Sequence, residues 1–314
     1  DKGSYSMEHT FDFVSIGEPL VGLYPVSGKP ELSRMIYGGD TSNVALAAAR
    51  LGLHTAFAGA VGDDPYGYGF IHLWEEREVD TSLIATDADR FTGLYVISFD
   101  EGTHRFAYYR NGSAASAYTP TPEMRSAIAS ARVVHTSGIT QAISTHMTDL
   151  VFELLGEARA NGATISYDVN YRAPLWPPER AGAVARATIE RYADIVSLNT
   201  DEIHTLGLAR SAEEFARTYL PSLQVVAVRD GEEGAQVFTA SGSYGAPAYA
   251  VDVADTVGAG DAFDAGLIVA FLRGLSAHES VRYANAVAAL TCRQTGSTKG
   301  HPTPEEVDSL LSRG

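Results

Sequence analysis

The residues 255–263 place glycines and an acid directly before an apolar, helix-like run that ends near Gly274. Gly258 and Gly260 let the backbone approach an anion closely, and the free N–H groups of a helix's first turn, together with its dipole, favour negative charge there. Such a site suits the charge that develops during phosphoryl transfer. Asp261 lies in this first turn, where the dipole favours its ionised form, so it is placed to accept a proton from a hydroxyl. A bare Gly-x-Gly-Asp is more often only a helix cap and a turn.

The complete string, Asp-Thr-Val-Gly-Ala-Gly-Asp-Ala-Phe, is more specific than its glycines alone. It resembles the C-terminal signature of the PfkB, or ribokinase-like, carbohydrate kinases. The resemblance implies that Asp261 is the catalytic base and that the backbone of Gly258, Ala259 and Gly260 forms an anion hole. The sequence has no Walker-type Gly-x-x-x-x-Gly-Lys-Ser/Thr string, which disfavours a P-loop kinase.

A second glycine pair, Gly38-Gly39, opens the first long helix-like run. The string 38–45 is similar to the N-terminal sugar-binding signature of the same family. This similarity implies Gly39 and Asn43 as sugar contacts, since an amide side chain can pair with sugar hydroxyls. A helix cap formed by Thr41, Ser42 or Asn43 is the alternative.

Asn199-Thr200-Asp201-Glu202 follows a strand-like run. The family carries an Asn-x-x-Glu motif at this place, where it orders the magnesium of MgATP through water, and carboxylates suit Mg²⁺ because the ion keeps most of its hydration shell. The resemblance therefore implies Glu202 at the metal and Asn199 at the nucleotide. Taken alone, Glu202 is more often a solvated acid in a first helical turn.

The turn 229–234 resembles the Gly-x-x-Gly turn that lies near the nucleotide in this family, which implies nucleotide contacts for Gly231 and Gly234. Relatives commonly carry lysine where this chain has Arg229, and an arginine meets phosphate with a fork of donors rather than a point charge. Asn285 and the Ala-rich run after it lie where relatives build the adenine pocket, although that run also reads as ordinary core. The implied cofactors are ATP and Mg²⁺, and a monovalent cation such as K⁺ stays open.

Four further strings, at 92–95, 106–116, 135–140 and 168–176, together resemble 2-keto-3-deoxygluconate kinases more than ribokinases or fructokinases. That substrate is an acid, and a carboxylate needs a cation or several donors in a shielded site. The resemblance implies that Tyr95, Tyr108 and Arg110 contact the sugar acid, and that Arg172 lies between the sugar and the transferring phosphate. Plain packing of aromatic residues in a sheet is the alternative for the tyrosines.

The substrate is left open at one place. Some relatives have an acidic residue after their last long helix, whereas residues 294–300 of this chain contain no carboxylate. A fructokinase or another keto-sugar kinase therefore stays in play, and a nucleoside kinase or a non-catalytic sugar-binding regulator is a more distant alternative.

The composition excludes some classes of function. The chain of 314 residues has a net charge of -16, and its lysines are Lys2, Lys29 and Lys299. No basic stripe is available for nucleic acid, and no apolar run approaches the length that crosses a bilayer. The single cysteine, Cys292, fits a reducing compartment, so we expect a cytoplasmic location.

Strand-like and helix-like runs alternate along the chain. The strands expected are 11–16, 54–61, 131–135, 164–168, 194–197 and 224–228, with a first helix over 43–51. This alternation is typical of an α/β fold with a doubly wound, mostly parallel sheet.

Two β-rich segments interrupt the alternation. A hairpin is expected from 92–99 and 104–110 around the turn 100–103, and the stretch 21–37 could pair with it as a small β lid. We therefore expect an α/β core of residues 7–20, 38–90 and 118–314, and a discontinuous lid of residues 21–37 and 91–117. Relatives often pair their lids, so a homodimer through the lid is the default expectation.

Overall fold

The computed structural model describes residues 10–26, 29–100, 103–296 and 298–313. The strands of its central sheet are β1 (Phe13–Ile16), β4 (Thr55–Gly62), β5 (Val79–Asp80), β6 (Ile84–Asp87), β9 (Val133–Ser137), β10 (Thr164–Asp168), β11 (Ile195–Asn199), β12 (Val225–Arg229), β13 (Ala235–Thr239) and β14 (Gly242–Ala246). The order across the sheet is β14-β13-β12-β11-β10-β9-β1-β4-β5, with β6 paired to β4. All pairs from β12 to β5 are parallel, whereas β13 and β14 pair antiparallel.

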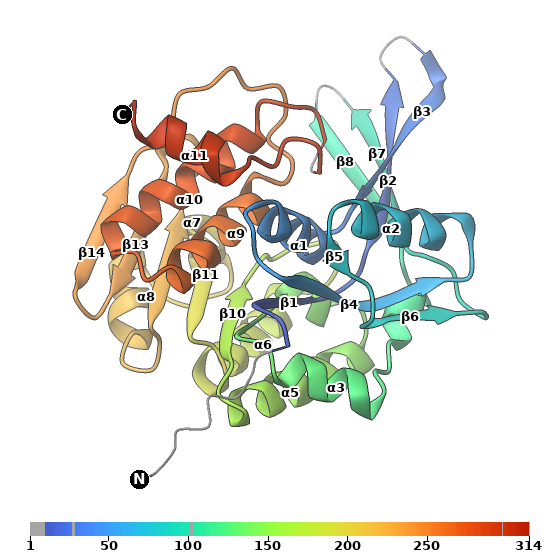
Figure 1. The fold of residues 1–314 in the computed structure, drawn as a ribbon, viewed down its shortest axis with the longest axis horizontal. Helices are drawn as coiled ribbons and strands as arrows, with labels where there is room; N and C mark the ends of the chain where they lie inside the picture. The colour runs from blue at the N-terminus through green and yellow to red at the C-terminus, as the bar shows by residue number, and fades with distance from the viewer. Residues whose placement is uncertain (1–9, 27–28, 101–102, 297, 314) are drawn as a thin grey trace.

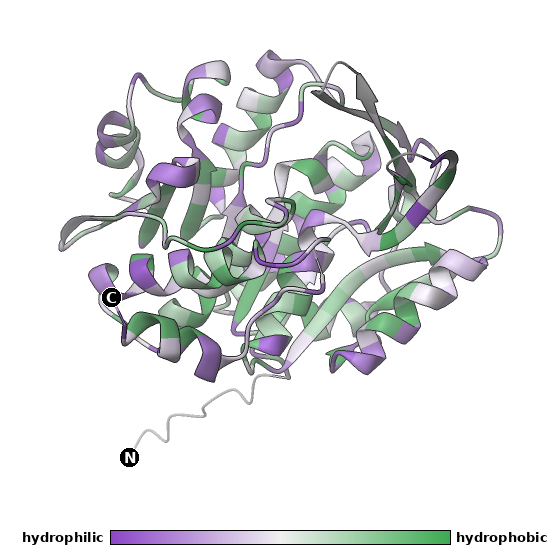
Figure 2. Ribbon diagram, turned by 90° about the horizontal axis from the view of Figure 1, so that it is seen from above, coloured by the Kyte–Doolittle hydropathy of each residue, from purple (hydrophilic) through white to green (hydrophobic). Residues whose placement is uncertain are grey.

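Helices cover both faces of this sheet (Figure 1). One face carries α1 (Asp40–Arg50), α2 (Pro65–Glu76), α9 (Ala259–Leu272), α10 (Ala277–Thr291) and α11 (Pro304–Leu311). The other carries α3 (Pro122–Ala129), α5 (Thr145–Ala160), α6 (Pro178–Arg191), α7 (Thr200–Thr205) and α8 (Ala212–Tyr219). The short helix α4 (Gly138–Gln141) follows β9 directly. Buried apolar side chains pack between the sheet and these helices, and the ribbon coloured by hydropathy shows hydrophobic residues in both the strands and the helices (Figure 2).

The local sequence accounts for this architecture. Every residue of β4 is buried, as expected for a parallel strand covered on both faces. Helix starts carry side-chain caps: Asp64 accepts N–H bonds at the start of α2, which has Pro65 in its first turn, and Thr303 forms a capping box at α11. The start of α2 follows the carboxyl end of β4, and binding crevices form at this end of the strands in open α/β sheets.

A second sheet stands apart from the core (Figure 1). Its strands are β2 (Leu20–Val26), β3 (Lys29–Gly38), β7 (Leu94–Asp100) and β8 (Thr103–Tyr109), in the order β3-β2-β7-β8. β2 pairs antiparallel with β3 and parallel with β7, and β7 and β8 form the antiparallel hairpin. We refer to this four-stranded sheet as the lid.

The expected α/β fold with a mostly parallel sheet and a small separate β sheet is confirmed, and β10 has the expected bounds. The first helix begins at Asp40, three residues before the expected start. The hairpin β13–β14 has no counterpart among the expected strands, and β14 contains Gly242 and Gly245, which weaken strand propensity.

The lid also differs from expectation at one end. Its last strand ends at Tyr109, whereas the range expected for the lid runs to residue 117. Residues Ala114–Ala117 form a 3₁₀ helix, and Ala114 and Ala115 pack in the core with α3 and α5. Residues 101–102 of the expected turn, and residues 7–9 at the expected start of the core, lie outside the described residues.

In the described part of the chain, no helix combines the length and the apolar character that crossing a membrane requires.

Candidate active site

A single large cavity, of about 1540 Å³, lies between the lid and the carboxyl ends of the central strands. Its wall combines residues from the lid (Tyr95 and Tyr108), from the start of α1, from the ends of β10, β11 and β12, and from the first turn of α9. The segment 248–257 and the inner face of α10 close its far end. The cavity is therefore long enough to hold two ligands end to end.

The start of α9 lies in the middle of this cavity. Gly258 is the N-cap residue with φ of 85°, a left-handed conformation that favours glycine. The residues Ala259 and Gly260 form the first helical positions, so their N–H groups have no partner within the helix. All three glycine-loop residues of the predicted anion hole line the cavity.

Asp261 follows in the same turn and also lines the cavity. Its Oδ2 accepts a hydrogen bond of 2.7 Å from Nδ2 of Asn43 on α1. Burial, reinforced by the negative charge of Asp40, raises the pKa of Asp261 to about 7. The helix dipole favours the ionised form, but desolvation and a neighbouring carboxylate outweigh the dipole and raise the pKa. A base with a pKa near 7 is well matched to proton transfer at neutral pH.

Gly39 and Asn43, the residues predicted to contact the sugar, lie at the start of α1, and Asn43 binds Asp261. Gly39 is the N-cap of α1 with φ of 99°, and a Cβ there would lie 2.4 Å from the carbonyl oxygen of Glu18. The cap alternative is wrong, since α1 has no side-chain cap: Asn43 instead reaches Asp261, and Oγ of Ser42 accepts from Nε1 of Trp74.

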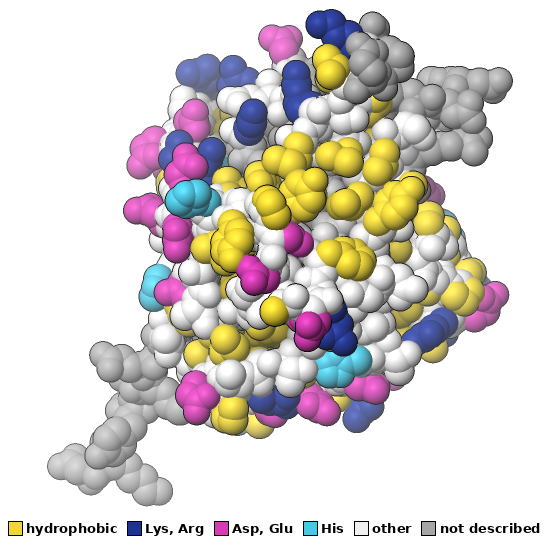
Figure 3. Space-filling model, turned by 90° about the vertical axis from the view of Figure 1, so that its right-hand side faces the viewer, with side chains coloured by type: hydrophobic (Ala, Val, Ile, Leu, Met, Phe, Trp, Pro, Cys, Tyr) yellow, Lys and Arg dark blue, Asp and Glu magenta, His cyan; other side chains and the backbone are white. Residues whose placement is uncertain are grey.

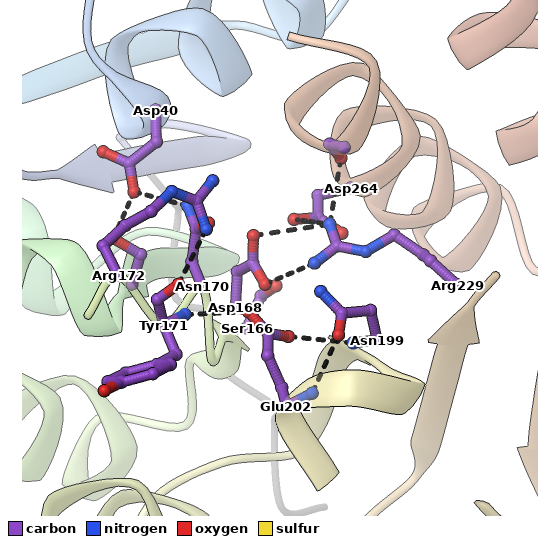
Figure 4. Close-up of polar contacts among 12 residues, drawn as sticks. Asp40, Ser166, Asp168, Asn170, Tyr171, Arg172, Asn199, Glu202, Arg229 and Asp264 are labelled. Carbon is purple, nitrogen blue, oxygen red and sulfur yellow. Dashed lines mark hydrogen bonds and ion pairs between the residues drawn. The ribbon is translucent and has the colours of Figure 1, made fainter. Parts of the chain in front are cut away.

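Asp40, the first residue of α1, also lines the cavity. Its Oδ2 accepts hydrogen bonds from Nδ2 of Asn170, at 3.0 Å, and from the Ser137 hydroxyl. Burial raises the pKa of Asp40 above its ordinary value. Arg172 is exposed and lines the cavity beside Asp40 and Asn170, with its Nη1 donating to the carbonyl of Tyr171 (Figure 4).

The two lid tyrosines lie on the cavity wall and also pack within the lid sheet. Tyr95 and Tyr108 line the cavity, and they also pack together with ring centroids 6.2 Å apart. The Tyr95 ring contacts Tyr24 as well. For these tyrosines, packing in the sheet therefore does not exclude a place on the cavity wall, and their contact with the sugar stays a prediction.

Arg110 differs from expectation. It does not appear in the cavity wall as an accessible cation; its side chain is buried, and its Nε donates to Oε2 of Glu18 at 2.6 Å. Its Nη2 lies 3.5 Å from the carbonyl oxygen of Ile139, which does line the cavity. Arg110 can lie in the core because a buried carboxylate from another segment compensates its charge.

Arg229 also differs from expectation. Arg229 lines the cavity, but two acids hold its guanidinium: Nη2 binds Oδ1 of Asp168 at 2.7 Å and Nη1 binds Oδ2 of Asp264 at 3.2 Å (Figure 4). Nη1 also lies 3.3 Å from the carbonyl oxygen of Gly260. Burial and the charge of Asp168 raise the pKa of Asp264 well above its ordinary value. The arginine thus ties β12, β10 and the α9 loop together, and this pairing competes with the phosphate contact that was expected.

Glu202 and Asn199 form a capping box at α7. Oδ1 of Asn199 accepts from the Glu202 N–H, and Oε2 of Glu202 accepts from the Asn199 N–H, both at 2.8 Å. Oε1 of Glu202 accepts from the Tyr171 N–H, also at 2.8 Å (Figure 4). Glu202 is 4% exposed and lines the cavity, so the alternative of a solvated surface acid was wrong. Burial raises its pKa.

The nucleotide-side residues lie at the far end. Gly234 has φ of 102°, and a Cβ there would lie 2.1 Å from the carbonyl oxygen of Ala246, so the turn packs directly on β14. Gly231 lines the same end. Nδ2 of Asn285 donates to the carbonyls of Ala246 and Pro247, at 2.8 and 3.1 Å, which fixes the strip that continues along the cavity.

Four acids that the sequence analysis gave no role belong to this site: Glu18, Asp40, Asp168 and Asp264. Glu18 and Asp168 come at or just after the ends of β1 and β10, Asp40 begins α1, and Asp264 lies one turn after Asp261 in α9. The signal available was their place at strand ends and helix starts. Their partners are 61 residues or more away in several cases, so the pairing itself was not readable.

The pfkB family carbohydrate kinase model matches residues 12–304. The chain is 32% identical to a 2-dehydro-3-deoxygluconokinase from Thermoproteus tenax, and the match covers 99% of this chain and 97% of that enzyme. It is 34% identical to the Bacillus subtilis enzyme of that name, over 96% of this chain and 95% of that one. A fructokinase from Zea mays is 29% identical over 96% of this chain and 94% of its own.

Solved structures agree with these relatives. The 2-dehydro-3-deoxygluconokinase of Thermotoga maritima superposes with a TM-score of 0.85 at 27% identity, covering 96% of this chain and 99% of that one. A fructokinase with bound ATP from Xylella fastidiosa superposes with a TM-score of 0.83 at 25% identity, over 96% and 98% of the two chains. The nearly complete family match and these identities confirm the resemblance read from the glycine strings, and the chain is a carbohydrate kinase of the pfkB family.

Proposed function

We propose that the enzyme transfers the γ-phosphoryl group of ATP to the primary hydroxyl of 2-keto-3-deoxygluconate, forming 2-keto-3-deoxy-6-phosphogluconate. The observation that carries this proposal is the position of Asp261 and the glycine loop, which lie between the lid end and the nucleotide end of one cavity. The names of the relatives at 32% and 34% identity support the choice of acceptor.

The residues of the α9 loop perform the proton and charge chemistry. Asp261, with its pKa near 7, accepts the proton of the acceptor hydroxyl, and the hydrogen bond from Asn43 orients its carboxylate. The N–H groups at the start of α9 stabilise charge that develops on the phosphoryl oxygens. Arg172, exposed at the cavity wall, adds a cation between the two ends.

The far end of the cavity fits ATP. The donors at the α9 start suit its phosphates, and Val251, Val253, Ala289 and Cys292 provide an apolar slot for a base. Bound MgATP supplies the phosphoryl group. This end is shaped by the backbone contacts of Asn199, Gly231, Gly234 and Asn285. Arg229 supports it through its ion pair with Asp168.

We propose that Glu202 orients Mg²⁺ through water rather than by direct ligation. Both of its oxygens already accept backbone N–H bonds, and the described residues contain no cluster of three metal-ligating side chains. Mg²⁺ that keeps its water and binds mainly to phosphate needs no such cluster. A magnesium titration of Glu202→Gln at fixed ATP tests this role, and an unchanged magnesium requirement would leave Glu202 as a cap. A monovalent ion such as K⁺ stays a further expectation.

The lid end fits a sugar acid. Tyr95 and Tyr108 line the cavity, and Nη1 of Arg110 is a buried donor for which the described residues supply no acceptor. A buried donor without a partner is costly, and an oxygen of the acceptor would satisfy it.

One observation favours a neutral keto sugar instead. Glu18 lies against Arg110 and cancels much of its charge, and fructokinases match at 29% identity. Fructokinase is therefore the second candidate.

The test is an acceptor panel of 2-keto-3-deoxygluconate, fructose, ribose and adenosine, with kcat/KM measured by ADP release. We expect the sugar acid to exceed the other three, and Arg110→Gln to lower its kcat/KM roughly tenfold to a hundredfold, the effect of losing a hydrogen bond to a charged group. Fructose should lose less, since it carries no charge. If fructose is the best acceptor of the parent enzyme, the sugar-acid assignment fails and the second candidate replaces it.

We also propose a cytoplasmic homodimer that associates through the lid. Leu32, Met35 and Tyr109 of the lid are exposed, at 47%, 44% and 58%, and hydrophobic side chains gather on the face of the molecule that carries the lid (Figure 3). Sedimentation of the parent and of Met35→Asp measures this association, and a monomeric parent would contradict it.

A further inference from the structure

The lid is joined to the core at four places, and all four meet at Glu18. The chain enters the lid through residues 17–20, returns through 38–40, enters again through 91–94 and leaves through 109–114. Glu18 lies in the first of these connections and is 2% exposed. It is thus a buried acid at the only place where the described lid strands connect with the core.

Each of the other three connections contacts Glu18. In the second, a Cβ on Gly39 would lie 2.4 Å from the Glu18 carbonyl oxygen, and in the third, a Cβ on Gly93 would lie 2.6 Å from Glu18 Oε1. These two glycines let the backbones approach the acid. In the fourth, Arg110 Nε donates to Oε2 at 2.6 Å and the Ser113 hydroxyl donates to Oε1.

The contact with Arg110 connects this junction to the sugar end of the cavity. Arg110 directly follows β8, and Tyr108, two residues earlier, lines the cavity. Its Nη2 reaches the carbonyl of Ile139, another lining residue, and its Nη1 is the buried donor without an acceptor. A shift of the Glu18 carboxylate would therefore move Arg110 and the root of β8 relative to the acceptor.

Stability alone is a poor reason for such a pair. Two charges buried at 1% and 6% side-chain exposure lose their hydration, and well-packed apolar residues often stabilise a protein equally well. A pair of this kind does, however, fix one geometry.

We propose that Glu18 is a positioning residue of the acceptor site: it holds Arg110 and the lid connections in the arrangement that binds the sugar. This inference rests on the proposed function only in that the acceptor is a sugar that binds under the lid. It requires no contact between Glu18 and the substrate.

The experiment compares Glu18→Gln with the parent enzyme, using the acceptor that the parent phosphorylates best. We expect the acceptor KM to rise roughly tenfold to a hundredfold, as for loss of a charge-assisted hydrogen bond. The KM for ATP should change by less than about twofold, because no nucleotide-end residue contacts Glu18. A fold defect would change both KM values and the amount of active enzyme together. A folded Glu18→Gln with an unchanged acceptor KM, or with equal changes in both KM values, overturns the proposal.

A double variant shows whether Glu18 acts through Arg110. Glu18→Gln/Arg110→Gln contains no uncompensated buried charge, and we expect its acceptor KM to match that of Arg110→Gln alone. Independent, multiplying effects on KM would show that Glu18 does not act through Arg110. Hydrogen exchange adds a second readout: acceptor should protect β7 and β8 in the parent and much less in Glu18→Gln.

Two further variants guard against misfolding and general effects. Ser113→Ala keeps the ion pair and removes one hydrogen bond to Glu18, so it should raise the acceptor KM by roughly threefold to tenfold; no change there also counts against the proposal if Glu18→Gln fails to fold. Glu157→Gln removes an ion pair with Arg125 far from the cavity and should leave both KM values unchanged. The acceptor panel of the parent enzyme tests the proposed function separately. The Glu18 test compares the acceptor KM of the variant with that of the parent, and it can use whichever acceptor the parent phosphorylates best.

Discussion

The phosphoryl-transfer end and the lid end of the cavity are built in different ways. At the α9 start, Gly258, Ala259, Gly260 and Asp261 are consecutive, and one helix start supplies both the donors and the base. At the lid end, Glu18 and Arg110 are 92 residues apart and come together only where four connections converge. The residues proposed for proton transfer and charge stabilisation thus lie within one short segment, whereas the proposed acceptor site depends on contacts between distant segments.

The Arg229 network lies between these two extremes. Its arginine is adjacent to the recognisable Gly-x-x-Gly turn, but its partners are Asp168 on β10 and Asp264 on α9. The local pattern therefore predicts a nucleotide contact for Arg229, whereas in the structure its guanidinium pairs with two acids of the site. A local motif can locate a residue without fixing the direction of its side chain.

The largest expected effect tests the locally encoded end. Asp261→Asn keeps the shape of the carboxylate and the hydrogen bond with Asn43 but removes the proposed proton acceptor, so turnover should fall by about a hundredfold to ten-thousandfold. KM values for ATP and acceptor should change little. Saturating kinetics on both proteins measure this, with Asp252→Asn as a control acid outside the α9 loop. Full turnover by Asp261→Asn would remove Asp261 as the base.

The second prediction concerns the network that long-range contacts create. Arg229→Gln leaves the carboxylates of Asp168 and Asp264 without their cation, and loss of one partner of a buried pair typically costs about 3 to 5 kcal/mol in the free energy of unfolding. Denaturant unfolding of the variant and the parent measures the difference. The matched control is Arg210→Gln, because Arg210 precedes α8 and forms a solvent-exposed pair with Glu214, so its loss should cost far less. Equal losses in the two variants would show that the Arg229 pairs are not part of a buried network.

The smallest effect links the two regions through pH. Because the folded-state pKa of Asp261 is about 7 and the ordinary value is 3.8, the folded protein holds this proton more tightly than the unfolded chain. The stabilisation is present at acid pH and is lost as the pH rises from about 4 through 7. Asp261→Asn cannot ionise, so at pH 8 it should be more stable than the parent by about 1 to 4 kcal/mol, and at pH 4 the two should be similar. Thermal unfolding across this range measures the difference, and parallel pH profiles would contradict the raised pKa.

Some features of the fold could be predicted from the sequence because their causes are local. The strand β10 contains β-branched and aromatic residues that favour strands. Several helix starts carry capping residues, and the α9 loop has its glycines two positions apart. The antiparallel hairpin β13–β14 could not be predicted with the same rules, since its pairing on the sheet edge compensates for a glycine-containing strand.

The sequence by itself determined the family and the mostly parallel sheet, and it located the loop that we propose for phosphoryl transfer, because each of these signals depends on neighbours a few positions apart. Only the tertiary structure decided what the charges do. Glu202 is a buried cap, Arg110 binds Glu18, and Arg229 binds Asp168 and Asp264. It also raised the pKa of Asp261, which the helix dipole alone would have lowered. Burial and charge pairing depend on which distant segments pack around a group, and no local pattern in the chain specifies that packing.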